Sequence, residues 1–187
     1  FYSFRQGIVL FVCLDVEASL FGAGSPQQEW LVRTLAGSDA AWKIVFFHEP
    51  PFSSDHSNVL VRLLLSPVFE RYGVDVVLSG HAHLYERTYP IRMYASSGPG
   101  IVYLTEGGGG AVLSTIERIP ESAFAEARFS YVLADVDGGR LTFQAYGLDG
   151  AVFDGIALEK AIAPTAERPA PQTSRGRPRT GVSKERQ

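Results

Sequence analysis

The sequence predicts an α/β protein with a largely parallel sheet, followed by an antiparallel meander. Over the first 80 residues, short apolar runs alternate with segments that have a helical pattern. Such alternation of strands and helices is typical of a parallel sheet. Over residues 129–158, three strand-like runs are joined by "DGG" and "LDG", which are turn signals between antiparallel strands.

The first two strands and the first helix follow from local signals. "FYSFRQGIVLFVCLD" indicates a strand, a turn at Gly7 and a second strand that ends near Asp15. We expect its first aromatic residues, "FYSF", in the core. "SPQQEWLVRTLAG" then predicts a helix, with Ser25 as N-cap, Pro26 in the first helical position and Gly37 after the last turn.

The next three elements continue the alternation. "KIVFFH" is a short buried strand that Pro50 and Pro51 stop. "NVLVRLLLSPVFERYG" is helical, with an interruption or restart expected at Pro67 and a stop at Gly73. "VDVVLSG" predicts another buried strand, and "GIVYLTEGGGG" predicts a later strand that runs into glycines.

Composition divides the chain into one domain and a tail. The 187 residues are 45% hydrophobic, enough for one substantial core. Residues 164–187 are rich in Pro and Arg and are expected to be a disordered basic tail, with six Lys/Arg and two Asp/Glu. The remainder holds 11 basic and 18 acidic residues, a net charge of −7, which disfavours a nucleic-acid platform. The tail's "RGRPR", residues 175–179, is similar to an AT-hook core, and a solvated basic tail is the favoured alternative.

Several other classes of protein are disfavoured. The single Cys13 excludes a disulfide within the chain. No apolar run approaches the roughly 20 residues of a membrane span. "EGGGG", residues 106–110, lacks the GK[ST] of a P-loop, so it is either a phosphate cradle or, the favoured reading, a flexible turn.

Histidines stand where two predicted parallel strands end. "KIVFFH" ends at His48, and "VDVVLSG" leads into "HAH", which contains His81 and His83. Ligands of open α/β sheets bind at the carboxyl ends of the strands, and imidazole suits Zn, Fe and Mn. We expect Gly80 to let the backbone turn so that both histidines point to this rim. His48 alone is better explained as a hydrogen-bonded core histidine, and for "HAH" alone the metal and non-metal interpretations are balanced. The combination of the two favours a metal site.

These motifs carry a resemblance to a known family. "VFFH" followed by "GHAHLYER" resembles VxxH and GHxH, the last two metal motifs of calcineurin-like metallophosphoesterases. The "YER", the start "FYSFRQGIVLFVCLD", the strand "YLTEGGGG" and the closing meander are similar to the purple acid phosphatase branch. The resemblance covers residues 1 to about 160. It implies a β-sandwich flanked by helices (αββα), of which residues 1–163 would be the carboxyl-terminal half.

The resemblance also implies a dinuclear metal centre that hydrolyses phosphate esters. The two metals of such a centre lie about 3.5–4 Å apart, and a metal-bound hydroxide attacks phosphorus. By similarity, His48 and His81 would bind a divalent metal (zinc, manganese or iron), and His83 would bind iron. His56, in "SSDHSN", falls where the family often has a histidine that faces the substrate. A surface-loop histidine without a function explains His56 equally well.

The anionic ligands of such a centre do not occur in the sequence. Three neutral imidazoles cannot hold two cations, and the family's early Asp, GDxx and GNH[DE] motifs are absent. Asp15 is expected in a turn or cap rather than on a metal. We therefore expect a missing amino-terminal half, with the isolated chain inactive. The coding sequence upstream of Phe1 would distinguish this enzyme from a non-catalytic phosphate- or protein-binding relic.

Two further expectations concern location and the residues after "HAH". The resemblance favours an extracytoplasmic or secreted protein. The start at Phe1 rather than Met leaves both a processed protein and a fragment open. Within Tyr85, Glu86 and Arg87, we expect an internal Glu86–Arg87 ion pair that holds the metal loop rather than a catalytic role.

Overall fold

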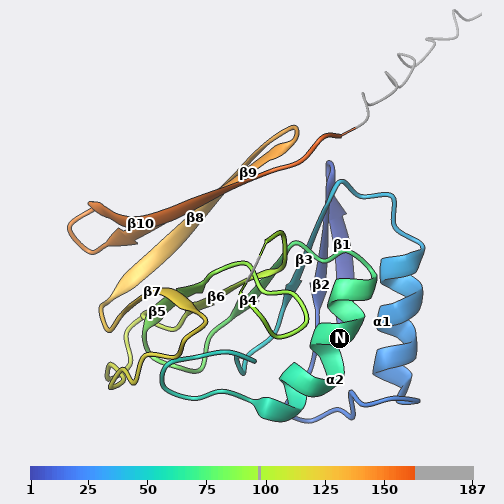
Figure 1. Ribbon diagram of the computed structural model, residues 1–187, viewed down its shortest axis with the longest axis horizontal. Helices are drawn as coiled ribbons and strands as arrows, with labels where there is room; N and C mark the ends of the chain where they lie inside the picture. The colour runs from blue at the N-terminus through green and yellow to red at the C-terminus, as the bar shows by residue number, and fades with distance from the viewer. Residues whose placement is uncertain (97, 163–187) are drawn as a thin grey trace, which may run out of the picture.

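The computed structural model describes residues 1–96 and 98–162, which form two helices and two sheets (Figure 1). The seven-stranded sheet has the order β1-β2-β3-β4-β6-β5-β7, and the three-stranded sheet has the order β10-β9-β8. The predicted α/β class with a closing antiparallel meander is confirmed. The strands are β1 (Tyr2–Gln6), β2 (Val9–Cys13), β3 (Trp42–Phe46), β4 (Val76–Ser79), β5 (Tyr85–Thr88), β6 (Val102–Glu106), β7 (Ser122–Glu126), β8 (Ser130–Asp137), β9 (Arg140–Gly147) and β10 (Val152–Glu159).

The centre of the larger sheet is parallel, as predicted. β2 pairs with β3, β3 with β4, and β4 with β6, all in parallel, whereas β1, β5 and β7 add antiparallel strands at the sides. All four parallel strands therefore present their carboxyl ends at the same rim of the sheet, where ligands bind in such folds.

The two helices begin and end close to the predicted residues. α1 (Pro26–Ala36) is capped by the Ser25 side chain, which accepts a hydrogen bond from the Gln28 N–H. α2 (Val59–Arg71) is continuous, so the predicted interruption at Pro67 is wrong. Pro67 lies on the exposed face of α2. Because proline has no N–H, one carbonyl of the preceding turn lacks its helical donor. On the exposed face this carbonyl can bond to solvent, so the helix continues without a break.

Both faces of the larger sheet are buried, by different layers. The helical side packs Leu31 and Leu35 of α1 and Leu65 and Phe69 of α2 against the sheet. The opposite side forms a second cluster, in which Trp42, Ile44 and Leu104 of the sheet contact Leu141 and Phe143 of β9. Burial on both faces explains why the parallel strands are continuous apolar runs rather than alternating ones.

Two short strands were not predicted, β5 and β7. β5 contains "YERT" and lies between β6 and β7, with Glu86 opposite both Thr105 and Ala125. A four-residue segment with two charged side chains has no strand periodicity of its own. Its strand conformation comes from pairing with neighbours on both sides, which is a tertiary effect.

The expectation that "FYSF" lies in the core is wrong. All five residues of β1 are exposed, and the exposed fractions of Phe1 and Tyr2 are 49% and 55%. β1 is an edge strand of the sheet. Beside it, a cavity of about 490 Å³ lies between the face of β2 and β3 and strand β8, lined by Phe11, Ile44 and Val136 among others. The apolar edge and this cavity are uncovered in the described part of the chain.

Some expectations concern residues that the structure does not describe. The predicted tail, 164–187, and its "RGRPR" segment, 175–179, lie outside the described residues. Neither described helix has the length and apolar character that a membrane crossing requires.

Candidate metal centre

The pairing of β3 with β4 continues past both strands and places two histidines together. The Phe47 N–H donates to the Leu78 carbonyl over 3.2 Å, and the Gly80 N–H donates to the His48 carbonyl over 3.0 Å. The two rings are then in contact, with 3.0 Å between His48 Nε2 and His81 Nδ1. Two nitrogens at this separation can serve one tetrahedrally coordinated cation.

The turn after β4 is made by His81 itself. His81 has φ +60°, whereas Gly80 has no positive φ. A Cβ on Gly80 would meet only His48 Nδ1, at an ordinary 3.8 Å. The expectation that Gly80 makes the turn is therefore wrong. A non-glycine residue in the left-handed region is uncommon, and such strained residues gather at functional sites.

His83 is held from both its backbone and its ring. Its N–H donates to the Ser114 hydroxyl over 3.0 Å, and its Nδ1 lies 2.8 Å from the Val112 carbonyl. Because a carbonyl can only accept, this contact assigns the proton to Nδ1. Nε2 is left as the nitrogen with a free lone pair. A histidine that ligates a metal commonly has its other nitrogen fixed in this way.

His56 reaches the same centre from the loop after β3. Its ring centroid lies 4.9 Å from that of His81, the same separation as between His48 and His81. The loop is anchored at Ser54, whose N–H and hydroxyl both donate to the buried carboxylate of Glu86. The structure therefore places both His48 and His56 beside the ring of His81.

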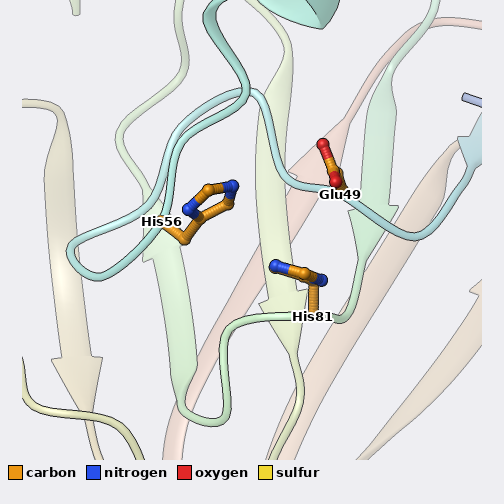
Figure 2. A group of neighbouring side chains, drawn as sticks. All are labelled: Glu49, His56 and His81. Carbon is orange, nitrogen blue, oxygen red and sulfur yellow. The ribbon is translucent and has the colours of Figure 1, made fainter. Parts of the chain in front are cut away.

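Glu49 joins this group and was missed by the sequence analysis. One ligand atom from each of Glu49, His56 and His81 lies within 4.8 Å of the others, and their side chains point toward one another (Figure 2). The only sequence signal was a carboxylate next to His48. Neighbouring residues of an extended chain usually point to opposite sides, so adjacency did not indicate a shared site.

The segment "YER" makes contacts around the site, but not through the predicted Glu86–Arg87 ion pair. Tyr85 and Arg87 point to one face of β5, where both bind Asp154 of β10; Arg87 makes two bonds, of 2.7 and 2.8 Å. Glu86 points to the other face and binds Ser54. The expected Glu86–Arg87 pair is therefore wrong, because successive strand residues alternate between faces.

Burial and hydrogen bonding act in opposite directions on Asp154. Burial alone would raise the pKa of Asp154, but the bonds from Arg87 and Tyr85 outweigh it, so the pKa lies below its usual value. The same contact raises the pKa of Arg87. Arg87 and Asp154 are thus a charged, nearly buried pair, with 14% and 10% of their side chains exposed.

The start of the glycine run is in close contact with the histidine loop. The Gly107 N–H donates to the Leu84 carbonyl and the Gly108 N–H to the Glu106 carboxylate, so neither N–H is free to cradle a phosphate. A Cβ on Gly107 would lie 2.0 Å from the Ala82 carbonyl oxygen. Burial raises the pKa of Glu106 despite the bonds from Ser130 and Gly108.

Asp15 has the turn role that the sequence favoured. Its carboxylate accepts hydrogen bonds from the Ser19 hydroxyl and from the N–H groups of Ala18 and Glu17. These bonds lower the pKa of Asp15. With its oxygens engaged in this turn, Asp15 is not part of the histidine cluster.

The donor atoms of the cluster suit a transition metal. Zn, Fe and Mn accept a set of imidazole nitrogens and one carboxylate. Mg and Ca, by contrast, favour oxygen ligands alone. The residues therefore fit a metal of the kind that the sequence motifs implied. The charge of a single carboxylate, Glu49, suits one divalent cation better than two.

Comparison with known proteins gives consistent results. Residues 11–85 match a family described as calcineurin-like phosphoesterase. A purple acid phosphatase of Glycine max is 30% identical over 183 residues, covering 84% of this chain and 38% of the relative. The Fe(3+)-Zn(2+) purple acid phosphatase 12 of Arabidopsis thaliana is 28% identical, covering 72% of this chain and 34% of the relative.

Solved structures show a similar architecture. A purple acid phosphatase from yellow lupin (Lupinus luteus) seeds has a TM-score of 0.76 and 25% identity, covering 84% of this chain and 32% of that structure. The structure of PhoD has a TM-score of 0.61 at 15% identity, which is a likeness of fold alone. The chain thus spans about a third of the length of these three purple acid phosphatases.

Proposed function

We propose, from the similarity of the chain to calcineurin-like phosphoesterases and purple acid phosphatases, that it carries part of a dinuclear metal centre that hydrolyses phosphoric esters. In this proposal His48 and His81 bind one divalent cation, and His83 binds the other. The substrate is a phosphate ester. By likeness to the Fe(3+)-Zn(2+) relative, the cations are iron together with zinc, manganese or a second iron.

One observation carries the proposal: His48 Nε2 and His81 Nδ1 converge to 3.0 Å from the ends of adjacent parallel strands. His83 adds support, because the Val112 carbonyl engages its Nδ1 and leaves Nε2 for a ligand. Second contacts of this kind orient imidazole ligands.

The residues around the centre would orient a phosphate ester. Bound cations supply positive charge to the phosphoryl oxygens and lower the pKa of a bound water, so that hydroxide is available as the nucleophile. His56 is exposed and beside His81, so it can donate a hydrogen bond to a phosphoryl or leaving-group oxygen. Its loop is anchored through Ser54 and Glu86, which would keep its ring at the rim.

We also propose that an upstream segment completes the domain and that the isolated 187 residues are inactive. Two cations need more negative charge than the single carboxylate of the cluster offers. The uncovered β1 edge and the cavity of about 490 Å³ beside β8 support a further segment. Such edges are normally paired or covered, because exposed apolar strands promote aggregation.

Hydrolysis of p-nitrophenyl phosphate tests the proposal. A longer protein that includes GDxx and GNH[DE] motifs upstream of Phe1, loaded with iron and zinc, should be active. His81→Ala in that protein should lower the activity by several orders of magnitude, since His81 contacts both His48 and His56. Ordinary enzyme rates from the isolated 187 residues would contradict the requirement for upstream ligands. A metal-loaded longer protein without activity on any phosphate ester would favour a non-catalytic relic.

The proposed location is outside the cytoplasm, by likeness to the plant purple acid phosphatases. Fractionation of cells that express the tagged longer protein measures it. Recovery of the protein in the cytoplasmic fraction alone would contradict this location.

A further inference from the structure

Glu49, His56 and His81 form a compact three-ligand cluster. Glu49 follows β3, His56 lies in the loop before α2, and His81 follows β4 (Figure 2). One ligand atom from each lies within 4.8 Å of the other two. In the described part of the chain, no other group of His, Cys, Asp and Glu meets this spacing. His48 and His83, the other candidate ligands, are not members of it.

The chemistry of the cluster is that of a mononuclear zinc-type site. Two imidazoles and one glutamate are a known donor set of catalytic zinc, with the fourth position open. Glu49 supplies a negative charge that imidazole ligands lack. A divalent cation bound by Glu49 and the two imidazoles would therefore leave a net charge of only +1. The imidazole nitrogens are borderline donors that favour a transition metal such as Zn or Fe over Mg or Ca.

Asn58 holds Glu49 in position for this role. The Asn58 side-chain amide donates to one carboxylate oxygen of Glu49, and its N–H donates to the Pro50 carbonyl over 2.8 Å. The Asn58 side-chain oxygen accepts from the Val61 N–H, so Asn58 is fixed as the N-cap of α2. One oxygen of Glu49 is thereby anchored, and the second is left for a ligand. Side chains held in this way lose less conformational entropy when they bind.

We propose that Glu49, His56 and His81 bind one divalent transition-metal ion, and that this chain alone is sufficient for it. The site shares His81 with the proposed phosphatase centre but needs neither upstream ligands nor hydrolysis. Occupation of this site would direct Nε2 or Nδ1 of His81 toward Glu49 and His56 rather than toward His48. The chain can therefore hold a metal at the rim of the sheet before any second cation is present.

Zn²⁺ titration of the 187-residue chain, freed of metal by a chelator, tests this site. Isothermal calorimetry should show one Zn²⁺ per chain, and Co²⁺ in its place should give the intense visible bands of a tetrahedral ion. Glu49→Gln keeps the size of the side chain and an oxygen for Asn58 but removes the charge. We expect it to raise the Kd for Zn²⁺ by about tenfold or more, or about 1.4 kcal/mol. His56→Ala should do the same.

Asp55→Asn is the matched control, because it removes one charge from the same exposed loop. Asp55 accepts a hydrogen bond from the Ser114 hydroxyl and is not in the cluster. The Kd of the Asp55→Asn variant for Zn²⁺ should therefore equal that of the unaltered chain.

His83→Ala distinguishes the two sites. An unchanged Kd supports the Glu49 site, whereas weaker binding in His83→Ala together with unchanged binding in Glu49→Gln would overturn it. Absence of Zn²⁺ binding by the unaltered chain at millimolar metal would also overturn it. Far-UV circular dichroism shows whether each variant is folded. The variants of the partly buried Glu49 and the exposed His56 test the site even if a change at His81 disrupts folding.

Discussion

Gly107 lies so close to Ala82 that a Cβ on the glycine would be 2.0 Å from the Ala82 carbonyl oxygen. Ala82 separates the two histidines of the "HAH" turn, so the glycine run after β6 limits where that turn can lie. Gly80, although it directly precedes His81, has no such contact. The glycine that matters for the histidine turn is therefore distant in the sequence.

Gly107→Ala should destabilise the protein and displace the histidine turn. The clash is with backbone, which cannot rotate away, so we expect a cost of about 1–3 kcal/mol in the free energy of unfolding. Zn²⁺ binding should weaken as well. Gly80→Ala is the control, with an expected change within about 0.5 kcal/mol. Urea unfolding measures both. Equal effects of the two substitutions would contradict the conclusion that Gly107, rather than Gly80, limits the position of the histidine turn.

Arg87→Ala should be strongly destabilising, because it leaves Asp154 nearly buried without its cation. Breaking a buried pair by removing one partner costs about 3–5 kcal/mol. The pair links β5 of the larger sheet to β10 of the meander. Arg140→Ala is the matched control, since its pair with Glu159 is well exposed and should contribute less than about 1 kcal/mol. Urea unfolding at pH 7 compares the two variants.

The contribution of Asp154 to stability should disappear in acid. The pKa of Asp154 is lowered in the folded protein, so the folded state favours the charged form. Its stabilisation is complete above the ordinary aspartate pKa of about 4 and is lost as the pH falls through the lower, folded pKa. Asp154→Asn should therefore be less stable than the unaltered protein at pH 7, with a difference that shrinks below about pH 4. Urea unfolding over a pH series measures this difference. A difference that stays constant over the series would contradict it.

Glu86→Gln should loosen the loop that carries His56. The buried carboxylate accepts two bonds from Ser54, and a Gln amide can accept only on its oxygen. The expected loss is about 1–3 kcal/mol of unfolding free energy. Hydrogen exchange of the amides from Ser54 to Asn58 should become faster. Glu117→Gln is the control. Glu117 is exposed and donates to the Ser54 carbonyl only through its backbone, so exchange there should stay unchanged.

The sequence by itself determined the elements whose signals are local. Ser25 and Pro26 begin α1, the turn glycines separate the strands of the meander, and continuous apolar runs make the parallel strands. The pattern of strands ending in His48 and "HAH" also pointed to one rim of the sheet. These features depend on periodicity and on backbone preferences of single residues, which a linear sequence displays.

Only the tertiary structure decided which side chains share a site. Glu49 points toward His56 and His81 because Asn58 anchors its carboxylate. β5 becomes a strand between two others, so Arg87 faces Asp154 instead of its neighbour Glu86. The aromatic start of the chain lies on an exposed edge rather than in the core. In each case the outcome depends on a partner far away in the sequence, and neither hydrophobicity nor spacing along the chain identifies that partner.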